Sequence, residues 1–363
     1  MNPPISEERG ARELAKLRDL ETSDPTDMRI CRGQAAGSGP GRRCGMLQLF
    51  MKLGGHLWTI TPNFRHRLRP QKPPKAEPWS TTLEDPRIGT VALQGQLQLP
   101  DPKADLVVLV HGLGGSPDSQ YIIQAAHAAT RAGLGCLRLG LRGTDRSGVD
   151  FYHAGLTQDL SAALASPALA EVRRIYLLGF SLGGHTSLRF ALTPSDRRVR
   201  AVATLCAPLD LHAGSRAIDR AKAWPYRRYL LDGLLEIYER VAARRSVPTP
   251  LAIARRITTM REWDAKTVVP RFGFNSADDY YSSMSVGPQL QRLALPALIV
   301  VTKQDPMVPA ATLRPYLEIP PPALTVRWMP RGGHVGFPRH SSLDLDDPRG
   351  TVLDQIFTCL RNH

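Results

Sequence analysis

The sequence predicts an α/β protein in which helices flank a mostly parallel central sheet and a helical cap is inserted. Three observations support this. Short apolar runs alternate with helical stretches from about residue 86 onward, several of these runs are apolar at nearly every position, and one long late segment holds no good strand. Because strands that alternate with helices are joined by right-handed crossovers, the sheet is expected to be parallel and covered on both faces.

Seven segments have the apolar character of strands. In chain order they are GTVALQGQLQL (89–99), DLVVLVHG (105–112), GLGCLRLGL (133–141), RIYLLGFS (174–181), RAVATLCAP (200–208), PALIVVTKQD (296–305) and LTVRWMP (324–330). Four stretches have helical character: SQYIIQAAHAATRAG, LTQDLSAALASPAL, GGHTSLRFALT and GTVLDQIFTCLRNH.

The chain divides into four predicted parts. Residues 1–45 are a weakly ordered leader rich in Gly, Pro, Asp and Arg, and residues 46–85 are an N-terminal extension that packs on the core. Within this extension, 62–80 reads as a basic, proline-rich connection. The α/β core comprises 86–211 and 291–363. Between these two pieces, residues 212–290 form the predicted cap, which is helical and rich in arginine.

The charge balance is strongly basic, with a formal net charge of +14 and a pI near 10. Such a balance is typical of proteins that contact phosphate, in nucleic acid or in anionic lipid. No Lys/Arg run is interleaved with aromatic residues, however, so nucleic acid is not an expected partner. A peripheral contact with anionic membrane stays open.

The cysteines and the first residues indicate a cytoplasmic protein. Five cysteines occur, and no pair has metal-ligand spacing: Cys31, Cys44, Cys136, Cys206 and Cys359. Cys136 and Cys206 lie in apolar runs and are expected to be buried thiols. The first residues lack the apolar core of a signal peptide. Residues 46–60 are apolar but too short to span a bilayer, so we expect no transmembrane helix.

The most informative short motif is GFSLG (179–183), which follows an apolar run and opens a helical stretch. Glycines at 179 and 183 remove side chains where strand and helix crowd each other, and Ser181 lies at the tip of the turn. A nucleophilic serine needs an exposed hydroxyl of this kind. An incidental serine in a plain strand–turn–helix is the alternative, but the context favours catalysis.

A second glycine-rich motif, HGLGG (111–115), directly follows the strand DLVVLV. Acyl transfer needs backbone N–H groups aimed at the developing oxyanion. The amide of Leu182 is the first expected donor and that of Leu113 the second. Glycine-rich turns also bind phosphate, but no Lys-Ser/Thr follows and no G-x-G-x-x-G with a suitable acid is present.

The acid and the base are expected later in the chain, in the order Ser, Asp, His. Asp305 ends the strand PALIVVTKQD, and His334 lies in RGGHVGF just after the strand LTVRWMP. Three such residues in this order on suitable elements predict a triad of Ser181, Asp305 and His334. Weaker alternatives are Asp278, Asp279, His340, His111 and His185; of these, His111 and His185 are expected to pack or hydrogen-bond.

Beyond the elbow, the sequence resembles the α/β-hydrolases, in particular the YheT-like branch related to the ABHD hydrolases. The motifs that carry the resemblance are HLWTITPNF (56–64), HGLGGSPDSQYI (111–122), LRGTDRSG (141–148), FYHAGLTQDL (151–160), GFSLGGH (179–185), REWD to SADDYY (261–281), TKQDPMVP (302–309) and GGHVGF (332–337). The resemblance spans about 56–360. It implies Ser181 as nucleophile, His334 as base and Asp305 as the acid that orients it. Two departures are Gly114, where an acidic residue is frequent, and His185, where an asparagine is frequent.

The expected activity is hydrolysis of carboxylic esters through an acyl-enzyme, with no metal or organic cofactor. Relatives in this branch imply short- or medium-chain acyl or lipid esters. The cap combines aromatic residues (Trp224, Tyr226, Tyr229, Tyr238, Trp263) with arginines (Arg227, Arg228, Arg244, Arg245, Arg255, Arg256). It predicts either docking on anionic membrane or a solvated basic face. An alcohol acyltransferase with the same triad, and a non-catalytic binding protein of this fold, stay as alternatives.

Overall fold

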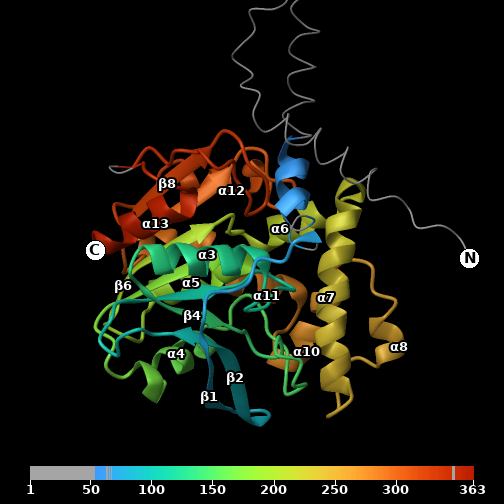
Figure 1. The fold of residues 1–363 in the computed structure, drawn as a ribbon. Helices are drawn as coiled ribbons and strands as arrows, with labels where there is room; N and C mark the ends of the chain where they lie inside the picture. Colours follow the sequence, from blue (N-terminus) through green and yellow to red (C-terminus); the bar gives the residue numbers. More distant parts are fainter. Residues whose placement is uncertain (1–53, 63, 65, 67, 346–347) are drawn as a thin grey trace, which may run out of the picture. The chain divides into compact units, whose positions relative to one another are not determined.

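The fold is that of a computed structural model, which describes residues 54–62, 64, 66, 68–345 and 348–363 (Figure 1). The predicted leader and residues 46–53 lie outside the described residues. Within the described part, the eight strands are β1 (Glu77–Asp85), β2 (Gly89–Gln98), β3 (Leu106–Val110), β4 (Gly135–Leu139), β5 (Ile175–Phe180), β6 (Val199–Leu205), β7 (Ala297–Thr302) and β8 (Leu324–Met329).

These strands form one sheet in the order β1-β2-β4-β3-β5-β6-β7-β8. The pairs β1–β2 and β2–β4 are antiparallel, and every pair from β4 to β8 is parallel. This mixed, mostly parallel sheet confirms the predicted fold class.

Helices cover both faces of the sheet. One face carries α3 (Gln120–Arg131) and α13 (Val352–Arg361), and the other carries α4 (Gln158–Leu164), the short η1 (Pro167–Leu169), α5 (Leu182–Leu192) and α12 (Ala310–Leu317). Along β3, Val107 and Leu109 pack toward α3, whereas Val108 and Val110 pack toward the opposite face. Since both faces are buried, such strands are apolar at every position.

Two of the elements named above were not predicted. The strand β1 begins in the predicted connection over 62–80 and ends with the predicted extension at 85; it lacks a strand signal because this edge strand is mostly exposed and Trp79 is its one fully buried residue. The helix α12 was not recognised, because it is short and contains Pro315. Neither element has the apolar period that marks buried strands or long amphipathic helices.

The regular elements between β6 and β7 are all helical and are joined by short loops. Its elements are α6 (Leu211–Ile218), η2 (Ala221–Ala223), α7 (Trp224–Ala242), α8 (Leu251–Ala254), α9 (Met260–Trp263), the π-helical η3 (Asp264–Val268), α10 (Val269–Phe272), α11 (Ala277–Met284) and η4 (Gly287–Arg292). Figure 1 shows α7 as the longest helix of this segment, upright along one side of the sheet. None of the helices in the described ranges combines the length and the apolar character needed to cross a bilayer.

A buried ion cluster joins this helical segment to the core. The guanidinium of Arg142, which is 2% exposed, contacts three carboxylates at 2.6–3.0 Å. They belong to Asp85, Asp150 and Asp159. Arg271 of α10 adds a second cation, 2.6 Å from Asp150. Because paired charges in the interior depend on one another, the cluster fixes the β1 edge, the loop after β4, α4 and α10 in one arrangement.

Candidate active site

Ser181 forms the turn between β5 and α5, with φ of 51° and ψ of −120°. A non-glycine residue with positive φ is strained and persists only where its surroundings enforce it. The Ser181 amide donates to the carbonyl of Leu205 at 2.8 Å, which holds the turn against β6. A Cβ at Gly179 would clash with the backbone of Gly183, and one at Gly183 would clash with the carbonyls of Val110 and His111. The two glycines are therefore required by close backbone contact.

The glycine turn after β3 abuts this serine, since a Cβ on Gly112 would lie 3.0 Å from Cβ of Ser181. Two tyrosines fix the turn, the buried Tyr152 and the partly buried Tyr121. The Gly112 amide donates to the hydroxyl of Tyr121 at 3.0 Å, and the Gly114 amide donates to that of Tyr152 at 2.8 Å. The Leu113 amide lies between these two anchored amides. The Leu182 amide begins α5, where no intrahelical acceptor is available to it.

His334 and Asp305 form a buried pair at the same edge of the sheet. Nδ1 of His334 lies 2.9 Å from Oδ2 of Asp305, and the two residues are only 8% and 6% exposed. Oδ1 of Asp305 accepts the amides of Met307 and Val308 at 2.8 and 2.9 Å, so the carboxylate is held on both oxygens. Nδ1 is thus engaged, and Nε2 is the ring nitrogen left for proton transfer.

A residue from the N-terminal extension also holds the histidine. The amide of His334 donates to Oγ1 of Thr59 at 2.8 Å, and Gly333 packs against the backbone of Gly55 and Thr59. Thr59 lies in TITP of the predicted extension, more than two hundred residues before its partner. The only sequence signal was the resemblance of HLWTITPNF to the family.

The thiol of Cys206 connects the strand beside Ser181 to the histidine loop. It follows β6 with φ of 54°, accepts the Val335 amide at 3.5 Å, and lies 3.7 Å from the Gly333 carbonyl. Burial, together with the charge of Asp305, raises the pKa of this thiol well above its usual value. Among the described residues, Cys206, Asp305 and His334 bring three ligand atoms within 4.8 Å. A protonated thiol is a poor metal ligand, and Asp305 and His334 already bond to each other.

Comparison with known proteins identifies the family to which this fold belongs. The α/β hydrolase fold family matches residues 105–340, well over half of the chain. The chain is an α/β-hydrolase. It is 32% identical over 243 residues to the Escherichia coli (strain K12) protein named "Putative esterase YheT", covering 64% of this chain and 70% of that one.

Two further proteins are similar over much of the chain. The phospholipase ABHD3 of Homo sapiens is 23% identical over 265 residues, which cover 69% of this chain and 62% of the phospholipase, less than two thirds of its length. The solved structure of the Pyrococcus furiosus esterase Pf2001 has a TM-score of 0.46 and 16% identity over 72% of this chain and 85% of that chain. The two sequence relatives of this α/β-hydrolase thus carry the names of a putative esterase and a phospholipase.

The FYHAG motif of this hydrolase joins three parts of the site. Tyr152 holds the glycine turn, the Ala154 carbonyl accepts Oγ1 of Thr186 in α5, and the Ala154 amide donates to the hydroxyl of Tyr280 in α11. Between them, His153 is enclosed by the rings of Phe272, Phe274 and Tyr280. Burial lowers the pKa of His153 to about 3, so the ring is neutral. The motif therefore links the turn, the elbow helix and the segment after β6.

The helix α7 rests directly on the glycine turn. A Cβ on Gly233 would lie 3.3 Å from Cα of Gly114, so two backbones meet without side chains between them. One turn further along α7, Glu236 forms a two-pronged ion pair with Arg146 at 2.7 and 2.9 Å. Gly114, one of the two departures from the resemblance, thus meets a second glycine across this contact.

The weaker sequence candidates lie in structural contacts. The ring of His111 is buried between the Gly112 carbonyl and the Leu141 amide, and that of His185 lies 2.8 Å from the Pro208 carbonyl. Burial lowers the pKa of each to about 4, which confirms the expected packing roles. Asp278 pairs with Arg261 on the surface, Asp279 bonds to Asn275, and His340 is exposed.

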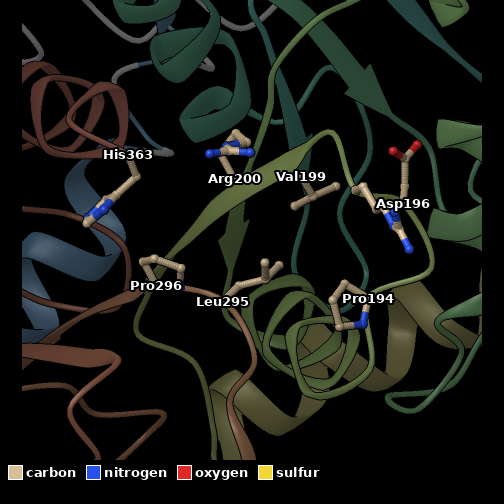
Figure 2. Close-up of a pocket in the computed structure, with 8 residues that line it drawn as sticks. Pro194, Asp196, Val199, Arg200, Leu295, Pro296 and His363 are labelled. Carbon is tan, nitrogen blue, oxygen red and sulfur yellow. The ribbon is translucent and has the colours of Figure 1, made fainter.

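Figure 2 shows a pocket of about 490 Å³ that lies elsewhere in the hydrolase. Its lining includes Val199, the first residue of β6, and Leu295 and Pro296, which precede β7. It therefore opens at the amino ends of the parallel strands, whereas Ser181, Asp305 and His334 follow carboxyl ends. The ligand sites of such sheets lie at the carboxyl ends, so we assign this pocket no part in the chemistry.

Proposed function

We propose that this α/β-hydrolase is a serine esterase that cleaves carboxylic esters through an acyl-enzyme. The observation that carries the proposal is the buried His334–Asp305 pair, 2.9 Å apart, at the edge of the sheet where Ser181 is held in a strained elbow. In this assignment Ser181 is the nucleophile, His334 the general base and Asp305 the residue that orients it.

The reaction has two acyl-transfer steps. As Ser181 attacks the ester carbonyl, Nε2 of His334 takes the hydroxyl proton and then delivers it to the leaving alcohol. Water, deprotonated by the same nitrogen, attacks the acyl-enzyme; the bond between the acyl carbon and Oγ of Ser181 breaks, His334 returns the proton to Oγ, and the carboxylic acid is released. In both steps the amides of Leu113 and Leu182 stabilise the oxyanion, and each such donor typically contributes about 3 kcal/mol.

The proposed substrates are esters with an apolar acyl chain. Two relatives carry names of the right class, an esterase and a phospholipase. The helix α7 bounds the glycine turn, and it presents Trp224 and Tyr229 with more than half of each side chain exposed. Apolar and aromatic groups at this end of the sheet favour acyl chains over charged acids.

The test combines turnover with covalent labelling. p-Nitrophenyl esters of graded acyl length measure hydrolysis, and a fluorophosphonate labels a nucleophilic serine irrespective of the natural substrate. We expect the wild type to be active and to gain one phosphonyl group on Ser181. We expect Ser181→Ala and His334→Ala to lose both properties, and Asp305→Asn to lose most of its turnover.

Matched controls separate catalysis from folding. His340→Ala removes an exposed histidine of the same loop region, and Asp279→Asn removes a carboxyl that was an alternative acid. Both should keep full labelling. Equal activity of the wild type and Ser181→Ala, or a label on another residue, would refute the assignment.

A further inference from the structure

Exposed large hydrophobic side chains gather on two segments of the described chain. Six of the eight that are at least 45% exposed belong either to residues 54–68 or to the first turns of α7. They are Leu57, Ile60, Phe64, Leu68, Trp224 and Tyr229. Single exposed apolar residues are ordinary, but a contiguous group marks an interaction surface.

The first segment is amphipathic. The described residues from 54 to 68 are helical, and its exposed residues Leu57, Ile60, Phe64 and Leu68 follow the spacing i, i+3, i+7, i+11. The opposite face, with Gly55 and Thr59, packs on the loops of Gln304 and His334. The apolar stripe is therefore turned away from the core.

The two segments lie side by side. Nδ1 of His56 is 2.5 Å from the hydroxyl of Tyr226 in α7, and the two rings are stacked with centroids 5.6 Å apart. Figure 1 shows the blue helix next to the upper end of α7. We call the six exposed residues together the apolar surface.

This surface borders the candidate active site. Thr59, next to Ile60 in the chain, accepts the backbone amide of His334. Burial, with a smaller contribution from the Asp305 carboxylate, raises the pKa of Tyr226 to about 12. The apolar surface therefore adjoins the loops that follow the carboxyl ends of β7 and β8.

Cations flank the apolar side chains. Arg216, Arg220 and Lys222 precede Trp224 with exposed side chains, and Arg69 and Lys72 follow Leu68. Between residues 216 and 228 the only acidic residue is Asp219, whose carboxylate accepts the amides of Met260 and Arg261. Apolar and aromatic side chains bordered by cations fit the interface of an anionic bilayer.

We propose that the apolar surface docks the protein on anionic lipid membrane, with the carboxyl edge of the sheet toward the lipid. Leu57, Ile60, Phe64 and Trp224 enter the interface, and the flanking arginines and lysines contact the headgroups. In combination with the proposed esterase activity, this orientation lets an acyl ester reach Ser181 directly from the bilayer. Binding itself does not depend on that activity.

The test is co-sedimentation of the full chain carrying Ser181→Ala with sucrose-loaded vesicles. The vesicles consist of phosphatidylcholine alone or with about 30% phosphatidylglycerol, since surface charge scales with anionic lipid. We expect binding only to the anionic vesicles, weakened by added salt. The double variant Leu57→Ser/Trp224→Ser should bind at least about tenfold more weakly.

The matched control is Ile319→Ser, which removes the most exposed hydrophobic residue of the described chain at 82%. Ile319 lies between α12 and the amino end of β8, at the opposite edge of the sheet, and its loss should not alter binding. Thermal unfolding of each variant checks that the fold is intact.

Three outcomes would overturn the proposal. In the first, the full chain stays in the supernatant, as expected if a second copy or its own first residues cover the surface. In the second, the double variant and Ile319→Ser bind the vesicles equally. In the third, Leu57→Ser abolishes a dimer and leaves vesicle binding unchanged. Since the binding assay uses Ser181→Ala, failure of the esterase assignment would leave its result unchanged.

Discussion

The hydroxyl of Tyr152 is expected to set the position of an oxyanion donor, so Tyr152→Phe should slow catalysis without touching substrate. The phenol oxygen accepts a hydrogen bond from the Gly114 amide at 2.8 Å, and Tyr152 is only 3% exposed. Its removal leaves a turn amide without an acceptor, at a cost of about 1–3 kcal/mol of stability. Loss of a whole oxyanion donor lowers kcat about 100- to 1,000-fold. Because the turn stays anchored through Tyr121, we expect a smaller effect, about tenfold to thirtyfold in kcat.

The assay is steady-state hydrolysis of a p-nitrophenyl ester, with kcat and KM measured separately. Loss of an interaction that the donor makes only in the transition state lowers kcat and leaves KM nearly unchanged. Tyr238→Phe is the control, because its hydroxyl also bonds to backbone, at Thr249, but lies away from the turn. If Tyr152→Phe loses stability like the control but keeps its full kcat, the hydroxyl has no positioning role and the reasoning is wrong.

Three further predictions concern stability and the contact under α7. Arg142→Met removes the guanidinium from three carboxylates, two of them fully buried, and should cost about 3–5 kcal/mol in urea unfolding; wild-type stability would contradict this. Buried histidines with pKa lowered to about 3–4 should destabilise the fold as pH falls from about 6.5, the unfolded value, toward 4. These are His111, His153 and His185. Burial raises the pKa of Asp264 to about 7, which offsets one of the three protons. The free energy of unfolding, measured by urea titration at each pH, should therefore drop by up to about 2.7 kcal/mol per pH unit, and a flat profile would exclude this linkage. Gly233→Val should lower kcat more than Gly233→Ala, because valine adds two methyl groups to a Cβ that would already lie 3.3 Å from Cα of Gly114; equal rates would contradict a role for this contact.

The sheet could be predicted largely because burial on both faces leaves a simple signal. Strands such as β3, β5 and β7 are buried at every position, and their sequences are apolar at nearly every position. The strand β1 carries no such signal, since one face of an edge strand is in water and it is held by pairing with β2. Its place in the sheet depends on a partner, and a local pattern does not contain that information.

In the candidate site, too, some features could be predicted from the sequence and others could not. Ser181, Asp305 and His334 could be predicted because each follows a recognisable strand, and parallel strands bring their carboxyl ends together. Their assignment to catalysis stays a prediction until the labelling experiment is done. The contacts that hold them were not predicted. Thr59 meets His334 across 275 residues, and the thiol of Cys206 meets the same loop from another strand.

Glycine at position 233 shows why such contacts escape a reading of the sequence. In the interior of a 19-residue helix, a glycine costs about 1 kcal/mol relative to alanine and looks like a local defect. The structure supplies the reason, because Gly114 with φ of 71° approaches it across the turn. Gly114 and Gly233, each unexpected from the sequence around it, contact each other. A residue that disfavours its own helix, with no explanation in the neighbouring sequence, thus points to a site where two distant segments of the chain are in contact.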